Sequence, residues 1–330
     1  MKERIKIGIV GYGNLGRGVE IAINENPDMQ LVCIVTKRDP KEINAMTPNI
    51  EILNVKDVEK MIGKVDVMIL CSGSAFDLPV QGPKFAKMFN TIDSFDTHAN
   101  IPQYFNEVNS AALEGKKVSI ISVGWDPGLF SLNRLYANSV LPSSKTYTFW
   151  GKGFSQGHSN AIKNIKGVID AVQYTIPIEE AMKKVREGLN PNLTTREKHT
   201  RECFVVVEEG ADKKLIEKQI KEMKNYFDEY DTAVHFVTQM ELNQNHKKML
   251  HGGVVITTAN TGIEKENKEI IEYSLKLDSN PEFTSSVLVA YARAASRLAE
   301  KKDFGGKTVF DIPPALLSMK SPEELRKEML

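Results

Sequence analysis

The first residues with a chemical signature are three glycines in a short turn. Gly11, Gly13 and Gly16 stand in the order G-x-G-x-x-G, directly after the apolar segment 4–10 and before an apolar-periodic run. In a strand–turn–helix unit these glycines make the turn, let the backbone approach a pyrophosphate, and let the helix pack on the strand. The helix N-terminus also offers unpaired N–H groups to the phosphates. This segment predicts a dinucleotide-binding site; a turn that merely packs is the alternative.

The residues after the second apolar segment, 29–35, indicate which dinucleotide is bound. Thr36, Lys37 and Arg38 stand where a chain that selects NAD usually carries Asp or Glu for the ribose 2′-hydroxyl. Two cations and a hydroxyl favour a 2′-phosphate, so we expect NADP. The third apolar segment, 65–71, ends in small residues that let the backbone approach a ligand across the carboxyl edge of a parallel sheet. The candidate cofactor-binding residues are Gly11, Tyr12, Gly13, Asn14, Leu15, Thr36, Lys37, Arg38, Cys71, Ser72, Gly73 and Ser74.

Carboxylates follow the next two predicted strands. Asp93, Asp96 and His98 stand at the end of segment 91–98, and Asp126 follows segment 117–123. Two carboxylates from neighbouring strand ends could bind an ammonium group and hold it beside a nicotinamide ring. The alternative is that Asp96 and Asp126 cap the turns that follow, because aspartate is common in turns.

Further polar residues are less specific. Arg201, before segment 203–207, could clasp a carboxylate with both arms of its guanidinium, but a solvated basic turn is the alternative. His251 precedes two glycines that clear space beside its ring, yet a lone histidine is commonly satisfied by the backbone. Asn280 precedes Pro281 and is a turn former by default.

The elements that position these residues alternate through about residue 124. Helices are predicted after Gly16, at 55–61, at 82–89 and at 107–113, between the strands already mentioned. Such alternation predicts an α/β fold with a doubly wound parallel sheet of the Rossmann type.

The pattern changes at the Pro-Gly turn 127–128, a natural crossing into a second domain. Strands are predicted at 147–150, 203–207, 234–237, 254–258 and 270–277, helices at 178–186 and 213–227, and a loop at 151–159. This mixture indicates an α+β substrate domain with an antiparallel sheet. The Ala-rich segment 282–301 predicts a long helix that packs back on the first domain. We therefore expect domains 1–124 and 125–280, and a C-terminal segment 281–330 that returns to the first.

Composition excludes several classes of protein. Lys plus Arg and Asp plus Glu both number 43, so there is no charge imbalance for nucleic acid or an anionic membrane. The chain has neither a signal-peptide pattern nor an apolar run near the ~18 residues that a membrane span requires. Cys33, Cys71 and Cys203 lie in apolar runs without metal-ligand spacing, which predicts buried thiols in a reducing cytoplasm and no metal site.

Taken together, the motifs resemble the meso-diaminopimelate D-dehydrogenase family along nearly the whole chain. The motifs that carry the resemblance are VGYGNLGR (10–17), GWDPG (124–128), FWG (149–151), SQGHS (155–159), QYT (173–175), HGG (251–253), ITT (256–258), and LD (277–278) leading to NP (280–281). The resemblance implies a Rossmann domain, a domain for substrate binding and dimerisation, and a homodimer. It also implies reversible, NADP-dependent oxidative deamination of the D-amino centre of meso-2,6-diaminopimelate in lysine biosynthesis. The products are ammonia and L-2-amino-6-oxopimelate, which cyclises toward tetrahydrodipicolinate.

The resemblance also assigns roles to individual residues. It places Asp96 and Asp126 at the reacting D-amino centre, with Asp126 as our candidate proton acceptor. The neighbouring wall comprises Trp125, Trp150, Gln156 and Gly157, and the distal, L-configured end comprises Thr175, Arg201, His251 and Asn280. Lys37 departs from the arginine pair that the family often has, which keeps the charge but loses one planar fork. Two alternatives stay open: another Rossmann amino-acid dehydrogenase, such as a homoserine or saccharopine type, and a non-catalytic NADP sensor.

Overall fold

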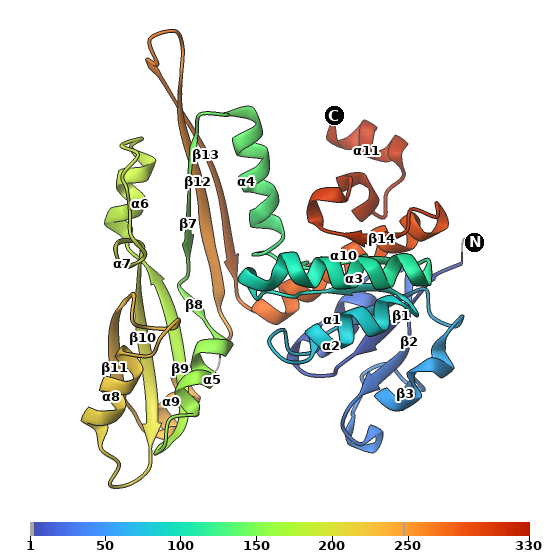
Figure 1. Ribbon diagram of the computed structural model, residues 1–330, viewed down its shortest axis with the longest axis horizontal. Coiled ribbons are helices and arrows are strands. Elements are labelled where there is room, and N and C mark those ends of the chain that lie inside the picture. The colour runs from blue at the N-terminus through green and yellow to red at the C-terminus, as the bar shows by residue number, and fades with distance from the viewer. Residues whose placement is uncertain (1–2, 247) are drawn as a thin grey trace. The chain divides into compact units, whose positions relative to one another are not determined.

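The computed structural model describes residues 3–246 and 248–330. The chain forms two compact units: residues up to 132 together with 281–330 make the first, and 133–280 make the second (Figure 1). Residues 125–132 therefore group with the first unit.

A seven-stranded sheet forms the centre of the first unit, and every neighbouring pair in it is parallel. Its strands are β1 (Ile5–Val10), β2 (Met29–Thr36), β3 (Glu51–Asn54), β4 (Val67–Leu70), β5 (Asn90–Asp93), β6 (Val118–Ile120) and β14 (Gly305–Lys307). The order β14-β6-β5-β4-β1-β2-β3 reverses direction between β1 and β4. This confirms the predicted doubly wound sheet and places its topological switch point at the glycine turn.

Helices connect these strands. The regular ones are α1 (Asn14–Asn24), α2 (Leu78–Ala86), α3 (Ile101–Gly115), α10 (Asn280–Glu300) and α11 (Pro322–Met329). Short 3₁₀ turns are η1 (Pro40–Glu42), η2 (Val55–Met61), η3 (His98–Asn100), η4 (Val309–Asp311) and η5 (Pro314–Leu317). Two edge strands, β3 and β14, were not predicted. They are only four and three residues long, too short for a periodic signal.

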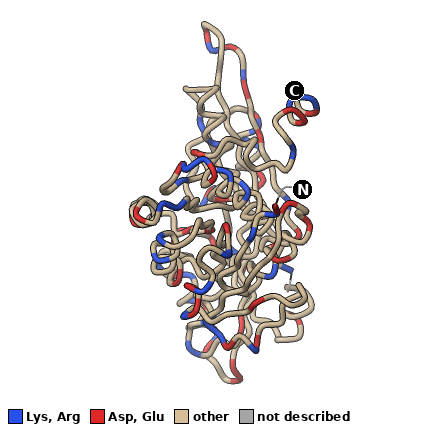
Figure 2. The backbone as a smooth tube through the Cα atoms, turned by 90° about the vertical axis from the view of Figure 1, so that its right-hand side faces the viewer, with Lys and Arg blue, Asp and Glu red and all other residues tan. Residues whose placement is uncertain are grey.

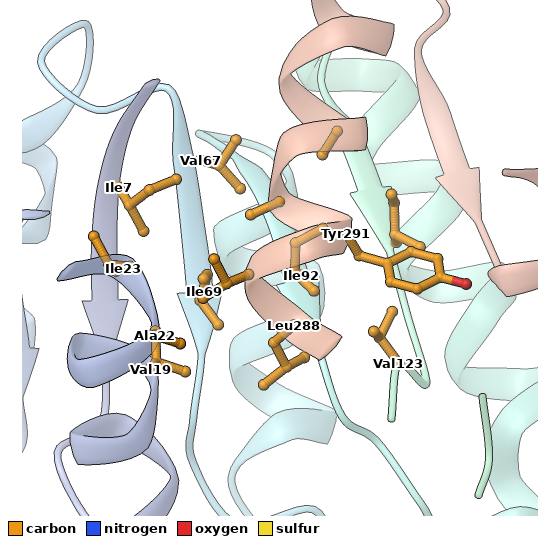
Figure 3. Packing of buried hydrophobic residues seen from close by; sticks show 14 of the residues in the cluster. Ile7, Val19, Ala22, Ile23, Val67, Ile69, Ile92, Val123, Leu288 and Tyr291 are labelled. Carbon is orange, nitrogen blue, oxygen red and sulfur yellow. The ribbon is translucent and has the colours of Figure 1, made fainter. Parts of the chain in front are cut away.

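Branched aliphatic residues of the sheet and of two helices on one of its faces make the main core of this unit. Figure 3 shows Ile7, Ile69 and Ile92 of the sheet packed against α1, which contributes Val19, and α10, which contributes Leu288. All five side chains are buried. The predicted Ala-rich helix is therefore α10, whose small residues let its backbone come close to the sheet.

The second unit contains two sheets where one antiparallel sheet was predicted. A four-stranded sheet has the order β11 (Asp231–Phe236), β10 (His199–Val207), β9 (Val168–Pro177), β8 (Gly153–Phe154), and its β10–β11 pair is parallel. An antiparallel three-stranded sheet has the order β13 (Asn267–Leu277), β12 (His251–Thr261), β7 (Lys145–Trp150). Helix α4 (Leu129–Val140) begins in the first unit and continues into the second from Asn133. The other helices of the second unit are α5 (Gln156–Lys163), α6 (Glu179–Arg186), α7 (Thr195–Lys198), α8 (Lys213–Lys221) and α9 (Gln239–Asn245).

Several predictions for this unit were wrong. The expected loop 151–159 contains β8 and the start of α5, where Ser155 caps the helix by accepting from the His158 N–H. The helix expected over 213–227 ends at Lys221. Strand β9 and helix α4 were missed; polar residues such as Asp170 and Gln173 interrupt the apolar pattern of β9, so tertiary contacts decide its conformation.

Three global properties bear on function. Basic and acidic residues are interspersed along the backbone without a long segment of one sign (Figure 2). Over the described residues, no helix is both long and apolar enough to cross a membrane. Cys33, Cys71 and Cys203 are free thiols, and no cluster of potential metal ligands occurs in the described part of the chain.

Candidate active site

A pocket of about 270 Å³ opens at the carboxyl ends of the first unit's central strands. Its lining is Val10, Gly11, Tyr12, Gly13, Val35, Thr36, Lys37, Arg38, Val55, Cys71, Ser72, Asp77 and Gln81. Eight of the twelve predicted cofactor residues lie in this lining. Asn14, Leu15, Gly73 and Ser74 are adjacent in the chain but do not line the pocket.

The glycine turn has the geometry that a phosphate cradle needs. Gly11 has a φ of +90°, which only glycine adopts readily. A Cβ at Gly16 would lie 2.2 Å from the Gly11 carbonyl oxygen, so the helix can pack here only without a side chain. A Cβ at Gly13 would meet no heavy atom within 4 Å. The backbone at Gly13 therefore faces open space at the N-terminus of α1, where a pyrophosphate fits.

Both predicted 2′-phosphate cations lie in the pocket wall, and both are held by protein groups. Lys37 pairs with Asp77, whose other carboxylate oxygen accepts from the Gly73 N–H at 3.2 Å. The Arg38 guanidinium donates to the Tyr12 carbonyl oxygen, and the Thr36 hydroxyl accepts from the Arg38 N–H at 3.1 Å. The cations are therefore positioned before any ligand arrives.

Sequence reasoning missed the two further polar residues of this wall, Asp77 and Gln81. Gln81 is 6% exposed, and its amide oxygen has no hydrogen-bond partner. Both lie after the Ser-Gly-Ser strand end, and α2 brings them into the pocket lining. The predicted helix over 82–89 began too late to include them, because α2 starts at Leu78 with Asp77 as its N-cap.

The candidate carboxylates occupy two neighbouring loops of the first unit. Asp96 is exposed, and its N–H donates to the Ser74 hydroxyl at 2.9 Å. Asp126 is half-buried in the turn after β6. Its neighbour Trp125 is buried edge-to-face against Phe130, with ring centroids 5.3 Å apart. Ser74, predicted as a cofactor residue, thus orients the Asp96 loop.

Asp93 ties these two loops together. Its Oδ1 atom accepts from the Phe95 N–H at 3.0 Å and from the Ser122 N–H at 3.1 Å, and its Oδ2 atom accepts from the Tyr104 hydroxyl at 2.6 Å. Complete burial raises the pKa of Asp93, while the three donors act in the opposite direction. Asp93 therefore has a positioning role. Of the two aspartates predicted at the end of this strand, Asp93 is buried and holds the loops in place, whereas Asp96 is exposed.

In the second unit, Arg201 and Thr175 meet across paired strands. They are partners in the β9–β10 register, and Arg201 Nη1 donates to the Thr175 hydroxyl. Arg201 is only 7% exposed, so the alternative of a solvated basic turn was wrong. Its guanidinium also stacks on the Tyr230 ring at 3.9 Å. The reason is strand alternation: position 201 points inward, while Glu202 does not.

The charge of Arg201 has no anionic partner. No carboxylate of the described chain lies within 4.0 Å of its guanidinium, and its Nε–H has no acceptor. Burial lowers the pKa of Arg201, although the group stays a cation in proteins. Burial also lowers the pKa of three histidines, and the positive charge of Arg201 adds to the effect. The pKa of His158 and the pKa of His199 fall to about 3, and the pKa of His251 lies below its ordinary value. A buried cation surrounded by neutral rings lowers the stability of the folded state unless an anion binds next to it.

The remaining candidates lie on neighbouring elements of the same unit. His251 begins β12 and accepts from the Gly252 N–H at 2.8 Å, and its ring occupies space that a Cβ at Gly153 would fill at 2.3 Å. Trp150 ends β7, and its indole stacks on the His199 ring with ring centroids 5.3 Å apart. The backbone N–H of Trp150 donates to His199 Nε2 at 2.8 Å. Gln156 is the first residue of α5.

Two more candidates complete the set. A Cβ at Gly157, the second residue of α5, would meet nothing within 4 Å. Asn280 does not form the expected turn but begins α10, and its N–H donates to the Met249 carbonyl at 3.0 Å.

The parallel sheet, the open glycine turn at its switch point and the cationic pocket wall define a dinucleotide-binding protein of the Rossmann class. A family model described as "NADP oxidoreductase coenzyme F420-dependent" matches residues 6–75, and one described as "Diaminopimelic acid dehydrogenase C-terminal domain" matches 124–279. The meso-diaminopimelate D-dehydrogenase of Ureibacillus thermosphaericus is 64% identical over 99% of this chain and 100% of its own. The chain belongs to the meso-diaminopimelate D-dehydrogenase family, and it is an amino-acid dehydrogenase.

Solved structures agree with this assignment. The diaminopimelate dehydrogenase of C. glutamicum in complex with DAP has a TM-score of 0.93 and 44% identity, covering 99% of both chains. An engineered D-amino acid dehydrogenase bound to NADP⁺ has a TM-score of 0.88 and 42% identity, covering 99% of this chain and 100% of its own. The predicted family and fold class are confirmed.

Proposed function

We propose that this protein catalyses the reversible, NADP-dependent oxidative deamination of the D-amino centre of meso-2,6-diaminopimelate. The products are L-2-amino-6-oxopimelate, which is a precursor of tetrahydrodipicolinate, and ammonia, and the reaction serves lysine biosynthesis in the cytoplasm. The observation that carries the choice of substrate is Arg201, a buried cation paired with Thr175 and lacking an anion. A substrate with a second carboxylate, far from the reacting carbon, supplies that anion.

The choice of NADP rests on the pocket wall of the first unit. Lys37 and Arg38 present positive charge in the same pocket as the glycine turn. No acidic residue occupies positions 36–38, where a carboxylate would accept from a 2′-hydroxyl. Asp77 neutralises Lys37 in this structure, so a 2′-phosphate has to share or replace that ion pair.

The reacting end of the substrate is assigned to Asp96 and Asp126. Their negative charge favours an ammonium group, and Asp126 then takes its proton so that the nitrogen lone pair can push hydride from the D-carbon. Bound NADP supplies the hydride acceptor. Water then adds to the resulting iminium carbon, and ammonia leaves. Asp126 is half-buried, which limits the water that competes for this proton.

The distal end is assigned to Arg201, Thr175, His251 and Asn280. The two ends of meso-diaminopimelate differ only in configuration, so a single ammonium site cannot distinguish them. Contacts with the distal end must therefore decide which end reacts. The guanidinium binds the distal carboxylate. The neutral His251 ring and the Asn280 side chain are assigned to the remaining polar groups. We assign Trp125, Trp150, Gln156 and Gly157 to the wall beside the reacting end.

We further propose a homodimer formed through the second unit. Strand β13 lies at the edge of its sheet, and Ile270 and Ile271 on it are 42% and 38% exposed. An eleven-residue edge strand with exposed branched residues is a template for pairing with another chain. A second copy of this chain would cover it. The balanced charge supports no nucleic-acid or membrane partner.

One assay tests the proposal directly. Purified protein with NADP and meso-diaminopimelate should show a rise of the reduced-nicotinamide absorbance, and ammonia should form in equal amount. LL-diaminopimelate should give no rise because it lacks a D-configured end. A dehydrogenase of another amino acid would respond to that amino acid instead, and a non-catalytic NADP sensor would bind the cofactor and respond to neither.

A further inference from the structure

Gln173 is a buried amide without a partner. It lies in the middle of β9 and is 0% exposed, and neither its Oε1 nor its Nε2 atom has a hydrogen bond to any residue that the structure describes. Its backbone, in contrast, is paired: its N–H donates to the Ser159 hydroxyl at 3.0 Å, and its carbonyl accepts from the Ser155 N–H at 3.0 Å. The unsatisfied group is therefore the side chain alone.

Strand geometry places this side chain beside the Arg201–Thr175 pair. Residues 173 and 175 lie on the same face of β9, because side chains alternate along a strand. Across the strand pair Gln173 is opposite Cys203, and Arg201 is opposite Thr175. Gln173 and Arg201 are thus diagonal neighbours, within reach for two long side chains. Beyond Gln173 the same face continues into the apolar cluster of Ala171, Cys203 and Val205, which offers no oxygen or nitrogen.

The energetic cost of this arrangement points to a missing ligand. Leaving a buried donor or acceptor unpaired costs about 1–3 kcal/mol, whereas an apolar side chain of the same shape costs nothing comparable. Arg201 Nε–H is unpaired on the same face. If these two side chains pair with each other, the Gln173 amide N–H still lacks an acceptor, which a bound ligand can supply.

A carboxylate closes this set of hydrogen bonds. Gln173 Oε1 can accept from Arg201 Nε–H, which leaves Gln173 Nε2–H to donate to a carboxylate oxygen. The Thr175 hydroxyl already accepts from Arg201, so its own hydrogen is free to donate to the same carboxylate. An ammonium group cannot take this place, because it would add a second positive charge beside Arg201.

We propose that Gln173 is a specificity-determining residue that completes the distal-carboxylate site, an inference that rests on the proposed function. Its amide oxygen holds the guanidinium through Nε, and its amide nitrogen contacts the substrate carboxylate. Gln173 thereby distinguishes substrates with a second carboxylate from short D-amino acids, which cannot complete the network.

The test uses Gln173→Met, which has nearly the same shape but lacks the amide, with Gln244→Leu, an exposed glutamine of the same unit, as the control. Steady-state rates with meso-diaminopimelate and with D-alanine, both with NADP, are measured together with melting temperatures with and without meso-diaminopimelate. We expect kcat/KM for meso-diaminopimelate to fall roughly 10- to 100-fold, mainly through KM, with less than about a twofold change for D-alanine. The ligand-free melting temperature should stay the same or rise, while the increase caused by meso-diaminopimelate should shrink.

Three outcomes would overturn the inference: equal losses on both substrates, wild-type kinetics, or a lower ligand-free melting temperature, which would show that the amide holds a structural water. Gln173→Glu provides a second variant if the first does not fold. Its carboxylate would pair with Arg201 and repel the substrate, so KM for meso-diaminopimelate should rise further. If the wild-type protein neither oxidises meso-diaminopimelate nor melts later in its presence, the proposed function itself fails.

Discussion

Single charged side chains at the proposed site lie in contrasting environments. Lys37 is exposed and already paired with Asp77, whereas Arg201 is buried without any anion in the described chain. Replacing an exposed, paired cation changes ligand preference with little effect on folding. Removing a buried, unpaired cation removes both a ligand contact and a cost to the folded state. The predictions for Lys37 with Arg38 and for Arg201 follow from this contrast.

The double substitution Lys37→Ser and Arg38→Ser should change cofactor preference. A charge-assisted phosphate contact is worth about 1.5–3 kcal/mol, so kcat/KM for NADP should fall at least about tenfold while kcat/KM for NAD changes little. Asp77→Asn, which removes the carboxylate that competes for Lys37, is the matched control and should retain the preference for NADP. Equal losses with NADP and NAD would show that the two cations do not contact a 2′-phosphate.

Asp126→Asn should keep the fold and NADP binding while slowing turnover. The amide preserves the shape of the carboxylate but cannot accept the proton, and loss of a general base costs about 10²–10⁴ in rate. Stopped-flow measurement of nicotinamide reduction and a fluorescence titration with NADP check the two parts. Wild-type turnover across the pH range would mean that Asp126 only caps the turn before Pro127.

Arg201→Ala should weaken the transition-state binding of meso-diaminopimelate by roughly 2–5 kcal/mol, because the distal carboxylate loses a buried charge partner. Activity with D-alanine should hardly change. Arg196→Ala, which removes an exposed arginine of the same unit paired with Asp231 at 2.9 Å, is the control. Should both substrates lose activity by the same factor, Arg201 would support the fold or the cofactor and not the distal carboxylate.

At the scale of elements, the ends of β5 and β6 are held in register by a carboxylate and not by the strand ladder alone. Asp93 receives one N–H from each of the two following loops and one hydroxyl from α3. Tyr104 is itself packed so closely against α2 that a Cβ at Gly82 would lie 2.1 Å from its hydroxyl oxygen. The candidate carboxylates Asp96 and Asp126 therefore depend on Asp93 for their positions.

Asp93→Ala should lower the free energy of unfolding by at least about 3 kcal/mol, because three buried donors lose their acceptor at about 1–3 kcal/mol each. Tyr104→Phe removes only one of these hydrogen bonds and should cost less than half as much. Urea denaturation followed by tryptophan fluorescence measures both. An unchanged midpoint for Asp93→Ala would mean that water satisfies the three donors.

At the scale of the whole molecule, buried neutral histidines make stability depend on pH. His199 is 1% exposed and accepts from the Trp150 N–H, and burial lowers its pKa to about 3. In the unfolded chain its pKa is about 6.5. Between these two values the unfolded state binds more protons than the folded state, so stability is present above pH 6.5 and is lost as the pH falls.

The expected slope is about 1.4 kcal/mol per pH unit for His199 below pH 6.5. His199→Phe keeps a ring against the Trp150 indole but leaves the backbone N–H of Trp150 without its acceptor. The variant should be less stable than wild type at pH 7, and its stability should fall less steeply between pH 6 and 5. His98→Ala, at an exposed position, is the control. If the His199→Phe and wild-type slopes were equal, another group would carry the acid sensitivity.

The sequence alone determined those features that are encoded locally. The glycine turn, its flanking strand and helix and the cationic pair at 37–38 were all predicted, because turn chemistry and strong apolar periodicity need no distant partner. The parallel sheet followed from strand–helix alternation. The family resemblance identified Thr175, Arg201 and the two aspartates, and their roles remain proposals.

Only the tertiary structure decided which polar residues are buried and with whom they pair. Arg201 looks like a surface arginine in its basic local sequence, and Gln173 interrupts an apolar pattern; pairing of β9 with β10 puts both on one buried face. Asp93 ends β5 and is enclosed together with Tyr104, whereas Asp96 lies in the loop beyond the strand and is exposed to solvent. Burial and hydrogen-bond satisfaction depend on contacts far apart in the chain, so a local pattern cannot assign them.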